Sequence, residues 1–196
     1  MSPRKAGRRR VFIFGDIDCV INAPGASLVW PESVNVSQTF AKHDTPFNRE
    51  HITITFAPAL VKALDKLRKV TGAIWVWHST WVETPQSVVR FTHMLGGLYG
   101  ADMVASPKRT ADFTYPRGWK AQHIIRYLEK HGPADFIVLD DEVGKWLQPL
   151  EVFAEEHGVR LLPIAPPEDW FYGPGLSPAD IEAMYEFIAA GETLTA

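Results

Sequence analysis

Short apolar runs alternate with longer amphipathic segments along most of this chain. The run from Val11 to Gly15 holds four consecutive apolar side chains and predicts a buried strand. Residues 58–71 carry apolar positions at helical spacing, and Gly72 follows them as a stop signal. Further strands are predicted at 73–77, 102–105, 136–139 and 160–164, and further helices at 84–95, 118–131, 143–157 and from Ser177 to about 190. This alternation predicts an α/β fold with a parallel sheet covered by helices on both faces.

One segment, residues 23–57, interrupts the alternation directly after the first strand. It is rich in turn-forming Pro, Gly and Asn and ends in the strand-like stretch 51–56. We expect a loop and a small hairpin here. Because an insert that follows a parallel strand projects at the carboxyl end of the sheet, where ligands bind in open α/β folds, this segment is a candidate cap or lid.

Composition favours one globular domain over residues 11–196. The chain has 196 residues, of which 46% are hydrophobic and 22% charged, which excludes a disordered or low-complexity protein. Its single cysteine, Cys19, excludes an internal disulfide and a CxxC zinc site, and favours a reducing compartment. No apolar run approaches the length of a membrane helix. We therefore expect a cytoplasmic protein with no membrane partner.

The net charge of −3 is unevenly distributed. Residues 1–10 hold five basic side chains and no acid, whereas the remainder holds 15 Lys and Arg against 23 Asp and Glu. This basic, flexible N-terminal arm has two interpretations: a solvated tail, or a contact to a polyanion such as RNA or DNA. The five residues are Arg4, Lys5, Arg8, Arg9 and Arg10.

Two acids follow the first predicted strand. Asp16 and Asp18 are two positions apart, so in extended chain both side chains point to the same side. Two such carboxylates repel each other unless a cation or a shared proton relieves them. The pair is either an ordinary surface turn or a site that combines a nucleophile, a metal ligand and a general acid.

Polar side chains also follow the next predicted strand, at 77–81. The hydroxyl groups of Ser79 and Thr80 can donate to a phosphate oxygen, or Ser79 can simply cap the following turn. His78 is a candidate for acid–base chemistry, but a single histidine between a tryptophan and a strand end favours a structural role.

A lysine and a second acid pair complete the candidate set. Lys120 lies in a predicted helix and can neutralise a carboxylate or a phosphoryl group, with Lys108 and Arg109 as rivals for that task. Asp140 and Asp141 directly follow an apolar strand, which favours Mg²⁺, although acids also commonly begin a helix.

These segments occur in the order acid pair, hydroxyl, lysine, acid pair, each at a strand end or in the helix beyond. The order and the spacing of Asp16 and Asp18 resemble the four motifs of the haloacid dehalogenase (HAD) superfamily of phosphohydrolases. Residues 14–22 are similar to the hydrophobic-DxDxVxN pattern of the first motif, with Cys19 where glycine is usual.

Residues 76–81, 139–142 and 175–177 resemble, more narrowly, a HAD branch described with Swiss Army Knife RNA-repair proteins. In that branch the second motif is approximately valine-tryptophan-alanine-threonine-glycine-tryptophan. Ser79 stands at the threonine and Thr80 at the glycine. The resemblance extends over residues 11–190.

The resemblance implies a three-layer, Rossmann-like sandwich with a five-stranded parallel sheet and Asp16 on the central strand. It implies a Mg²⁺-dependent phosphohydrolase in which Asp16 forms an aspartyl-phosphate and Asp18 is the general acid and then the general base. Ser79 and Lys120 would hold the phosphoryl oxygens, and Thr80 and Lys108 are further substrate-binding candidates. The implied metal ligands are Asp16, the backbone carbonyl of Asp18, and Asp141, while Asp140 binds through water or orients Lys120.

Three functions fit these features. The first is a phosphatase for nucleic-acid ends or nucleotides, favoured by the branch resemblance, the basic arm and the tryptophans, of which Trp77 and Trp81 are either packing residues or a base-stacking surface. The second is a small-metabolite phosphatase, which the acidic body and the candidate lid suit equally well. The third is a catalytically degenerate HAD fold used as a binding module, against which the intact acids argue. The oligomeric state stays open.

Overall fold

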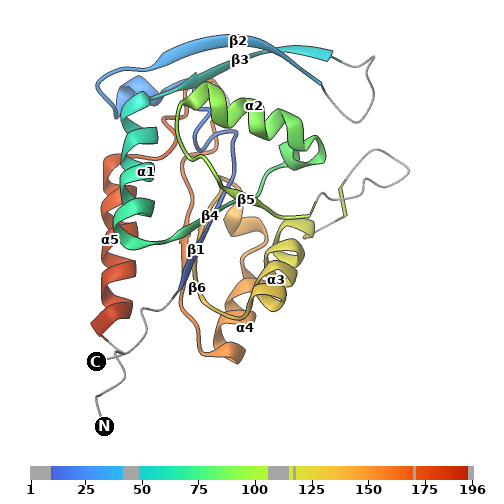
Figure 1. Ribbon diagram of the computed structural model, residues 1–196, viewed down its shortest axis with the longest axis vertical. Coiled ribbons are helices and arrows are strands. Elements are labelled where there is room, and N and C mark those ends of the chain that lie inside the picture. Colours follow the sequence, from blue (N-terminus) through green and yellow to red (C-terminus); the bar gives the residue numbers. More distant parts are fainter. Residues whose placement is uncertain (1–9, 42–48, 106–114, 117, 170, 194–196) are drawn as a thin grey trace.

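The molecule is built on a five-stranded parallel sheet with the strand order β5-β4-β1-β6-β7 (Figure 1). The computed structural model describes residues 10–41, 49–105, 115–116, 118–169 and 171–193. The fold is an α/β, Rossmann-like sandwich with β1 at the centre of the sheet, as predicted. The strands are β1 (Val11–Gly15), β4 (Ile74–Trp77), β5 (Asp102–Met103), β6 (Asp135–Leu139) and β7 (Leu161–Ile164).

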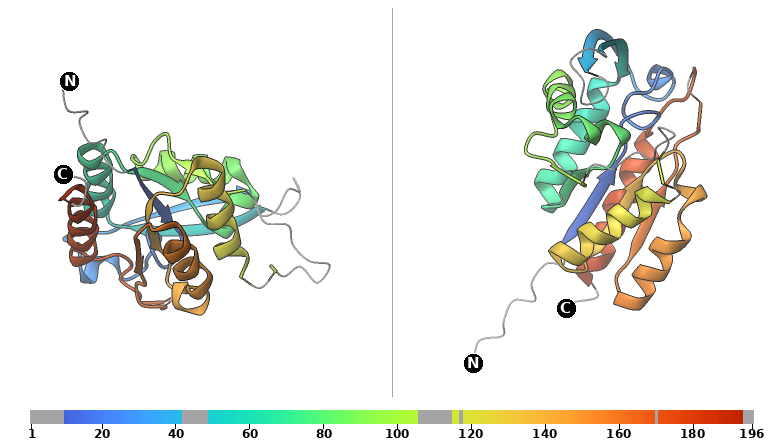
Figure 2. Two further views of the ribbon diagram at one scale, coloured as in Figure 1. Left: turned by 90° about the horizontal axis from the view of Figure 1, so that it is seen from below. Right: turned by 90° about the vertical axis from the view of Figure 1, so that its right-hand side faces the viewer.

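Five helices cover the two faces of this sheet (Figures 1 and 2). Helices α1 and α5 contact each other on one face, and α3 and α4 contact each other on the other. The end of α2 lies beside α1, where the Leu98 N–H donates to Asp65 Oδ1 at 2.9 Å. The helices are α1 (Pro58–Thr71), α2 (Pro85–Leu95), α3 (Trp119–His131), α4 (Gln148–His157) and α5 (Pro178–Thr193).

The register of the central strands brings their carboxyl ends to one level. Gly15, the last residue of β1, is paired with Trp77 on one side and with Leu139 on the other. A Cβ at Gly15 would lie 2.2 Å from the Trp75 ring, so only glycine fits there. Because the three strands end together, the next residues, Asp16, His78 and Asp140, emerge side by side.

The insert after β1 contains an antiparallel hairpin of β2 (Val34–Ala41) and β3 (Arg49–Phe56). The hairpin lies across the carboxyl end of the sheet, at the opposite end from the first residue of β1 (Figure 1). A backbone hydrogen bond from Ala23 N to Thr55 O, 2.8 Å long, ties it to the loop after β1. The predicted hairpin is therefore present, and it is placed where a lid would be.

One predicted helix begins later than expected. Residues 143–157 do not form a continuous helix: a 3₁₀ turn covers Val143–Lys145, and α4 begins at Gln148. The reason is Pro149, which has no N–H and whose ring would clash with the carbonyl four residues earlier in a longer helix. Pro149 instead lies in the first turn of α4, where its missing N–H has no consequence.

Two predicted features fall outside the described residues, namely the basic arm up to residue 9 and the pair Lys108 and Arg109. Arg10 is described: its guanidinium lies 5.0 Å from the centre of the Phe12 ring and donates to the carbonyl of His131. Within the described part of the chain, no helix combines the length and the apolar character that crossing a membrane requires.

Candidate active site

The loop after β1 makes one tight turn that returns the chain toward its start. The Ile21 and Asn22 N–H groups both donate to the Ile17 carbonyl, at 2.9 and 2.8 Å. Cys19, in the middle of this turn, is buried and has a φ of +57°. A left-handed conformation costs a non-glycine residue roughly 1–2 kcal/mol. This cost explains why glycine is usual at this position of the first motif that the sequence resembles.

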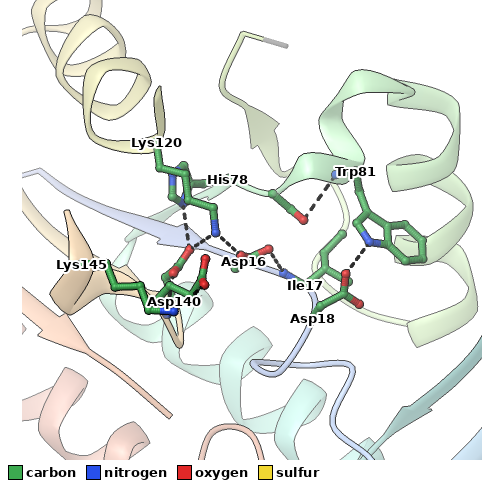
Figure 3. Close-up of polar contacts among 10 residues, drawn as sticks. Asp16, Ile17, Asp18, His78, Trp81, Lys120, Asp140 and Lys145 are labelled. Atoms are coloured by element: carbon green, nitrogen blue, oxygen red, sulfur yellow. Dashed lines mark hydrogen bonds and ion pairs between the residues drawn. The ribbon is translucent and has the colours of Figure 1, made fainter. Parts of the chain in front are cut away.

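A buried ion-pair network lies at the end of the sheet. The Lys120 ammonium reaches from α3 and donates to Asp16 Oδ2 at 2.5 Å and to Asp140 Oδ2 (Figure 3). Asp16 and Asp140 are 6% and 0% exposed, and Lys120 is also buried. The structure therefore brings together one member of each acid pair, Asp16 and Asp140, and one of the candidate lysines, Lys120.

The surroundings of Asp16 and Asp140 shift the pKa values of these two buried carboxyl groups in opposite directions. Burial raises the pKa of Asp16, but the charge and the hydrogen bond of Lys120, with smaller contributions from His78 and Ser79, together bring it below its ordinary value. Burial and the charge of Asp16 raise the pKa of Asp140 well above its ordinary value, against the effect of Lys120. Asp16 is thus the ionised member of the pair, as a carboxylate nucleophile must be.

Three carboxyl groups converge at a distance that suits one cation. Asp16, Asp140 and Asp141 each offer an oxygen, and these oxygens lie within 4.8 Å of one another. Burial and the charge of Asp16 also raise the pKa of Asp141. Three acids beside one lysine leave an excess of negative charge, and a hard divalent cation bound by carboxylates would offset it. The contact of Asp140 with Lys120 fits the interpretation that Asp140 orients this lysine.

Asp18 occupies a different environment from Asp16. Asn22 Nδ2 donates to its Oδ1 and Trp81 Nε1 donates to its Oδ2, each at 2.8 Å. Figure 3 shows its carboxyl group turned toward Trp81, on the side away from Lys120. Burial raises the pKa of Asp18 to about 6, although the hydrogen bonds from Asn22 and Trp81 oppose the shift. A carboxyl group with this pKa can exchange a proton near neutral pH.

Ser79 performs the capping role and also lies beside the nucleophile candidate. Its Oγ accepts a hydrogen bond from Trp81 N at 3.4 Å and caps the 3₁₀ turn Thr80–Glu83. A hydrogen bond with its side chain contributes to lowering the pKa of Asp16. Thr80 begins that turn and is half-buried, one residue beyond Ser79.

His78 has the environment of a structural residue. It is fully buried between the rings of Trp119 and Trp146, whose centres lie 5.9 and 5.4 Å from the imidazole centre. Burial and the Lys120 charge lower the pKa of His78 to about 3, so the ring is neutral. Among the described residues, neither ring nitrogen finds a hydrogen-bond partner, and Nδ1 lies 4.0 Å from Asp140 Oδ2.

Of the two interpretations of the motif tryptophans, packing residues or a base-stacking surface, the structure supports packing. Trp77 is 1% exposed and packs against Phe91, so its faces are closed to a nucleobase. Trp81 also packs against Phe91, and its indole N–H is directed at Asp18. The sequence interpretation missed this contact, as well as the contact of Asn22 with Asp18. The spacing of Asp18 and Asn22 in a predicted turn is the one signal that pointed to the second contact.

Comparison with known protein families gives a match that covers most of the chain. A family model described as the HAD domain in Swiss Army Knife RNA repair proteins matches residues 12–163. The matched segment runs from β1 to β7 and contains every acid, hydroxyl and lysine of the candidate site. No curated protein matches the chain.

Proposed function

Because the chain belongs to the family of HAD domains found in Swiss Army Knife RNA repair proteins, we propose that it is a Mg²⁺-dependent phosphohydrolase that acts through an aspartyl-phosphate. HAD domains are generally hydrolases or phosphatases. The observation that carries the proposal is the environment of Asp16. Its carboxylate is buried, is kept ionised by Lys120 and lies beside the Ser79 side chain.

In the first step, an Asp16 oxygen attacks phosphorus and forms a P–O bond while the bond to the leaving alcohol breaks. Asp18 gives its proton to the departing oxygen. In the second step, water attacks the aspartyl-phosphate, Asp18 takes a proton from that water, and phosphate leaves as the Asp16 carboxylate is restored. Lys120 and Ser79 donate to the phosphoryl oxygens, which develop charge during both transfers.

The residues present fit a Mg²⁺ ion. The carboxyl oxygens of Asp16 and Asp141 would hold it, together with the backbone carbonyl of Asp18, and Asp140 would orient Lys120. The bound ion would supply positive charge between the carboxylate nucleophile and the phosphate dianion. The convergence of the three carboxyl groups supports this assignment, and the charge of Asp16 adds to burial in raising the pKa of Asp140 and of Asp141.

Nucleic-acid ends or nucleotides are the proposed substrates. Support comes from the occurrence of this family in RNA repair proteins and from the basic residues at positions 1–10. A small phosphorylated metabolite is the second candidate, favoured by the acidic remainder of the chain, which would repel a polynucleotide backbone. In both cases the β2–β3 hairpin is proposed as a lid over the site.

Turnover of a 3′-phosphorylated oligonucleotide, mononucleotides and sugar phosphates should be compared at equal Mg²⁺ concentration. Preference for the oligonucleotide by kcat/KM supports the first substrate class, and preference for a sugar phosphate supports the second. Removal of residues 1–9 should weaken oligonucleotide binding most at low salt and leave turnover of a small ester unchanged. Absence of turnover with every ester would favour a binding module and contradict the proposed activity.

A further inference from the structure

Resting on the proposed function, we infer that Trp81 and Asn22 are positioning residues for the Asp18 carboxyl group, and that Asn22 makes its placement depend on the β2–β3 hairpin. Neither residue is expected to contact the phosphoryl group. Their role is to direct the carboxyl group that gives and takes the proton.

The contacts with Asp18 use one donor for each oxygen. Asn22 Nδ2 donates to Oδ1 and Trp81 Nε1 donates to Oδ2, both at 2.8 Å. A carboxyl oxygen can accept two hydrogen bonds, so each oxygen keeps a second position at which a proton can reside. Two donors from different segments oppose rotation of the carboxyl group about its single bonds, while proton transfer stays available.

Trp81 is itself held in place by its surroundings. Its ring packs on Phe91 of α2 with 5.6 Å between ring centres, and its backbone N–H donates to Ser79 Oγ at 3.4 Å. The direction of the indole N–H is therefore set by α2 and by the turn that begins at Ser79. The same turn carries a proposed phosphate-binding residue and the group that aims the acid.

Asn22 connects the acid to the hairpin through the other end of its amide. Asn22 Oδ1 accepts a hydrogen bond from Thr55 N of β3 at 3.0 Å, and the next residue, Ala23, donates through its N–H to Thr55 O at 2.8 Å. Within the hairpin, Thr55 Oγ1 donates to Asn35 Oδ1 of β2 at 2.6 Å. Displacement of β3 would break the bond that holds the Asn22 amide, so a displaced hairpin leaves Asp18 with one fixed donor fewer.

The test measures how kcat/KM depends on the leaving group. For this mechanism kcat/KM includes only the steps up to departure of the alcohol, and so reports on Asp18 as an acid. An alkoxide needs a proton in order to leave, whereas 2,4-dinitrophenolate does not. Trp81→Phe keeps an aromatic ring against Phe91 but removes the N–H. We expect kcat/KM for glycerol 2-phosphate to fall by about 10²-fold and that for 2,4-dinitrophenyl phosphate to change less than about 3-fold.

Trp77→Phe is the matched control. Trp77 packs on the same Phe91 ring, 5.7 Å between centres, so the substitution removes the same atoms from the same cluster. It should reduce both rate constants alike, if at all. An equal loss for both esters in Trp81→Phe, or the same selective loss in Trp77→Phe, would show that Trp81 contributes packing only and would overturn its assignment.

The assignment of Asn22 is tested independently through Asn22→Ala, which keeps Trp81 intact. It should produce the same selective loss, and Trp81→Phe with Asn22→Ala should lose less than the product of the single effects, because both act on one carboxyl group. Nonselective loss in Asn22→Ala would overturn this assignment even where the Trp81 variant fails to fold.

The hairpin connection is tested at Thr55. Thr55→Pro removes the backbone N–H that donates to Asn22 Oδ1, whereas the control Thr55→Val removes only the hydroxyl and keeps that N–H. We expect a selective loss in Thr55→Pro and none in Thr55→Val. A nonselective loss in Thr55→Pro, or the same selective loss in both variants, would overturn the dependence on the hairpin.

Failure of this inference is distinguishable from failure of the proposed function. Asp18→Asn should show the selective loss in its largest form. If the unsubstituted protein hydrolyses neither of these esters nor the oligonucleotide, mononucleotides and sugar phosphates named above, the proposed function is wrong. If it hydrolyses both and Asp18→Asn is selective, but the Trp81 and Asn22 variants are not, only the positioning inference is wrong.

Discussion

Strand β6 carries one buried aspartate at its first residue and another directly after its last, and the two have opposite surroundings. Asp135 is 1% exposed and accepts three hydrogen bonds from Arg160: from N at 2.9 Å, Nε at 3.0 Å and Nη2 at 2.7 Å. Asp140 is 0% exposed and shares the single ammonium of Lys120 with Asp16. One end of the strand pairs one acid with one base, and the other end gathers three acids around one base.

The difference teaches how to separate a structural ion pair from a site built for chemistry. At the Asp135 end the carboxylate and the Arg160 guanidinium compensate each other, and the guanidinium is packed further over the Phe187 ring, 4.4 Å from its centre. At the Asp140 end burial, together with the charge of Asp16, raises the pKa of Asp140 and of Asp141. Under the proposed function a cation and a phosphoryl substrate would bind there, so substitutions at the two ends should have opposite consequences.

The largest effect is expected at the Asp140 end of β6, from a substitution of Asp16. Asp16→Asn preserves the size of the side chain but removes the charge that attacks phosphorus. We expect kcat to fall by at least ~10³-fold, because a covalent nucleophile acts as part of a unit. The protein should stay folded, which circular dichroism checks. Turnover within tenfold of the unsubstituted protein would reject Asp16 as the nucleophile.

A substitution of Asp135 is expected to affect stability and not turnover. Asp135→Ala leaves Arg160 without its carboxylate partner, and loss of one member of a buried pair destabilises by about 3–5 kcal/mol. We expect roughly 3 kcal/mol in the free energy of unfolding, the low end of that range, because the Arg160 side chain is 23% exposed and can be hydrated. Urea titration measures the change. The kcat of the folded fraction should be unaffected, and a selective loss of turnover would contradict the structural role.

Mg²⁺ should sharpen the comparison by acting at one end only. Chelation should abolish turnover and added Mg²⁺ should restore it, while Mg²⁺ at about a hundredfold excess over its Kd should stabilise the fold by about 2.7 kcal/mol. Asp141→Ala should raise the Mg²⁺ concentration needed for both effects, whereas Asp135→Ala should leave it unchanged. Thermal unfolding with and without Mg²⁺ measures the shift in Tm. Full turnover in excess EDTA would contradict the assignment of a metal site.

The smallest expected effect is a dependence on pH. The pKa of Asp18 is raised to about 6, and this residue must be protonated to act as an acid. For glycerol 2-phosphate, kcat/KM should therefore decline as pH rises through about 6, up to tenfold for each pH unit. Because the pKa of Asp16 is lowered, the Asp16 carboxylate stays ionised over the whole pH range of this measurement. A flat profile between pH 5 and 8, measured at saturating Mg²⁺, would contradict the assignment of Asp18.

Local pattern was sufficient for the sheet but insufficient for the contacts within the site. The strands were predicted to within a few residues because each is a short apolar run bounded by turn-forming residues. The helix expected from residue 143 was wrong because periodicity alone does not register the missing N–H of Pro149. The strand-end positions of Asp16 and Asp140 predicted that these two acids meet, since parallel strands deliver their carboxyl ends to one edge of the sheet.

Contacts between distant segments were beyond what the sequence indicates. Trp81 and Asp18 are 63 positions apart, and nothing in the residues between them shows that the indole N–H meets the carboxyl group. Likewise, spacing left Lys108 and Lys120 as rivals. Lys120 meets Asp16 because the first turn of α3 lies beside the end of β1, and that is a property of helix packing.

The conformation and burial of Cys19 also determine how this thiol reacts. It is the single cysteine of the chain, and burial together with the charge of Asp141 raises its pKa to about 12. At neutral pH only ~10⁻⁵ of it is then the reactive thiolate. Alkylating reagents and mild oxidants should therefore modify it only when the loop after β1 transiently opens. The rate of that modification would therefore measure how often the loop that carries Asp18 opens.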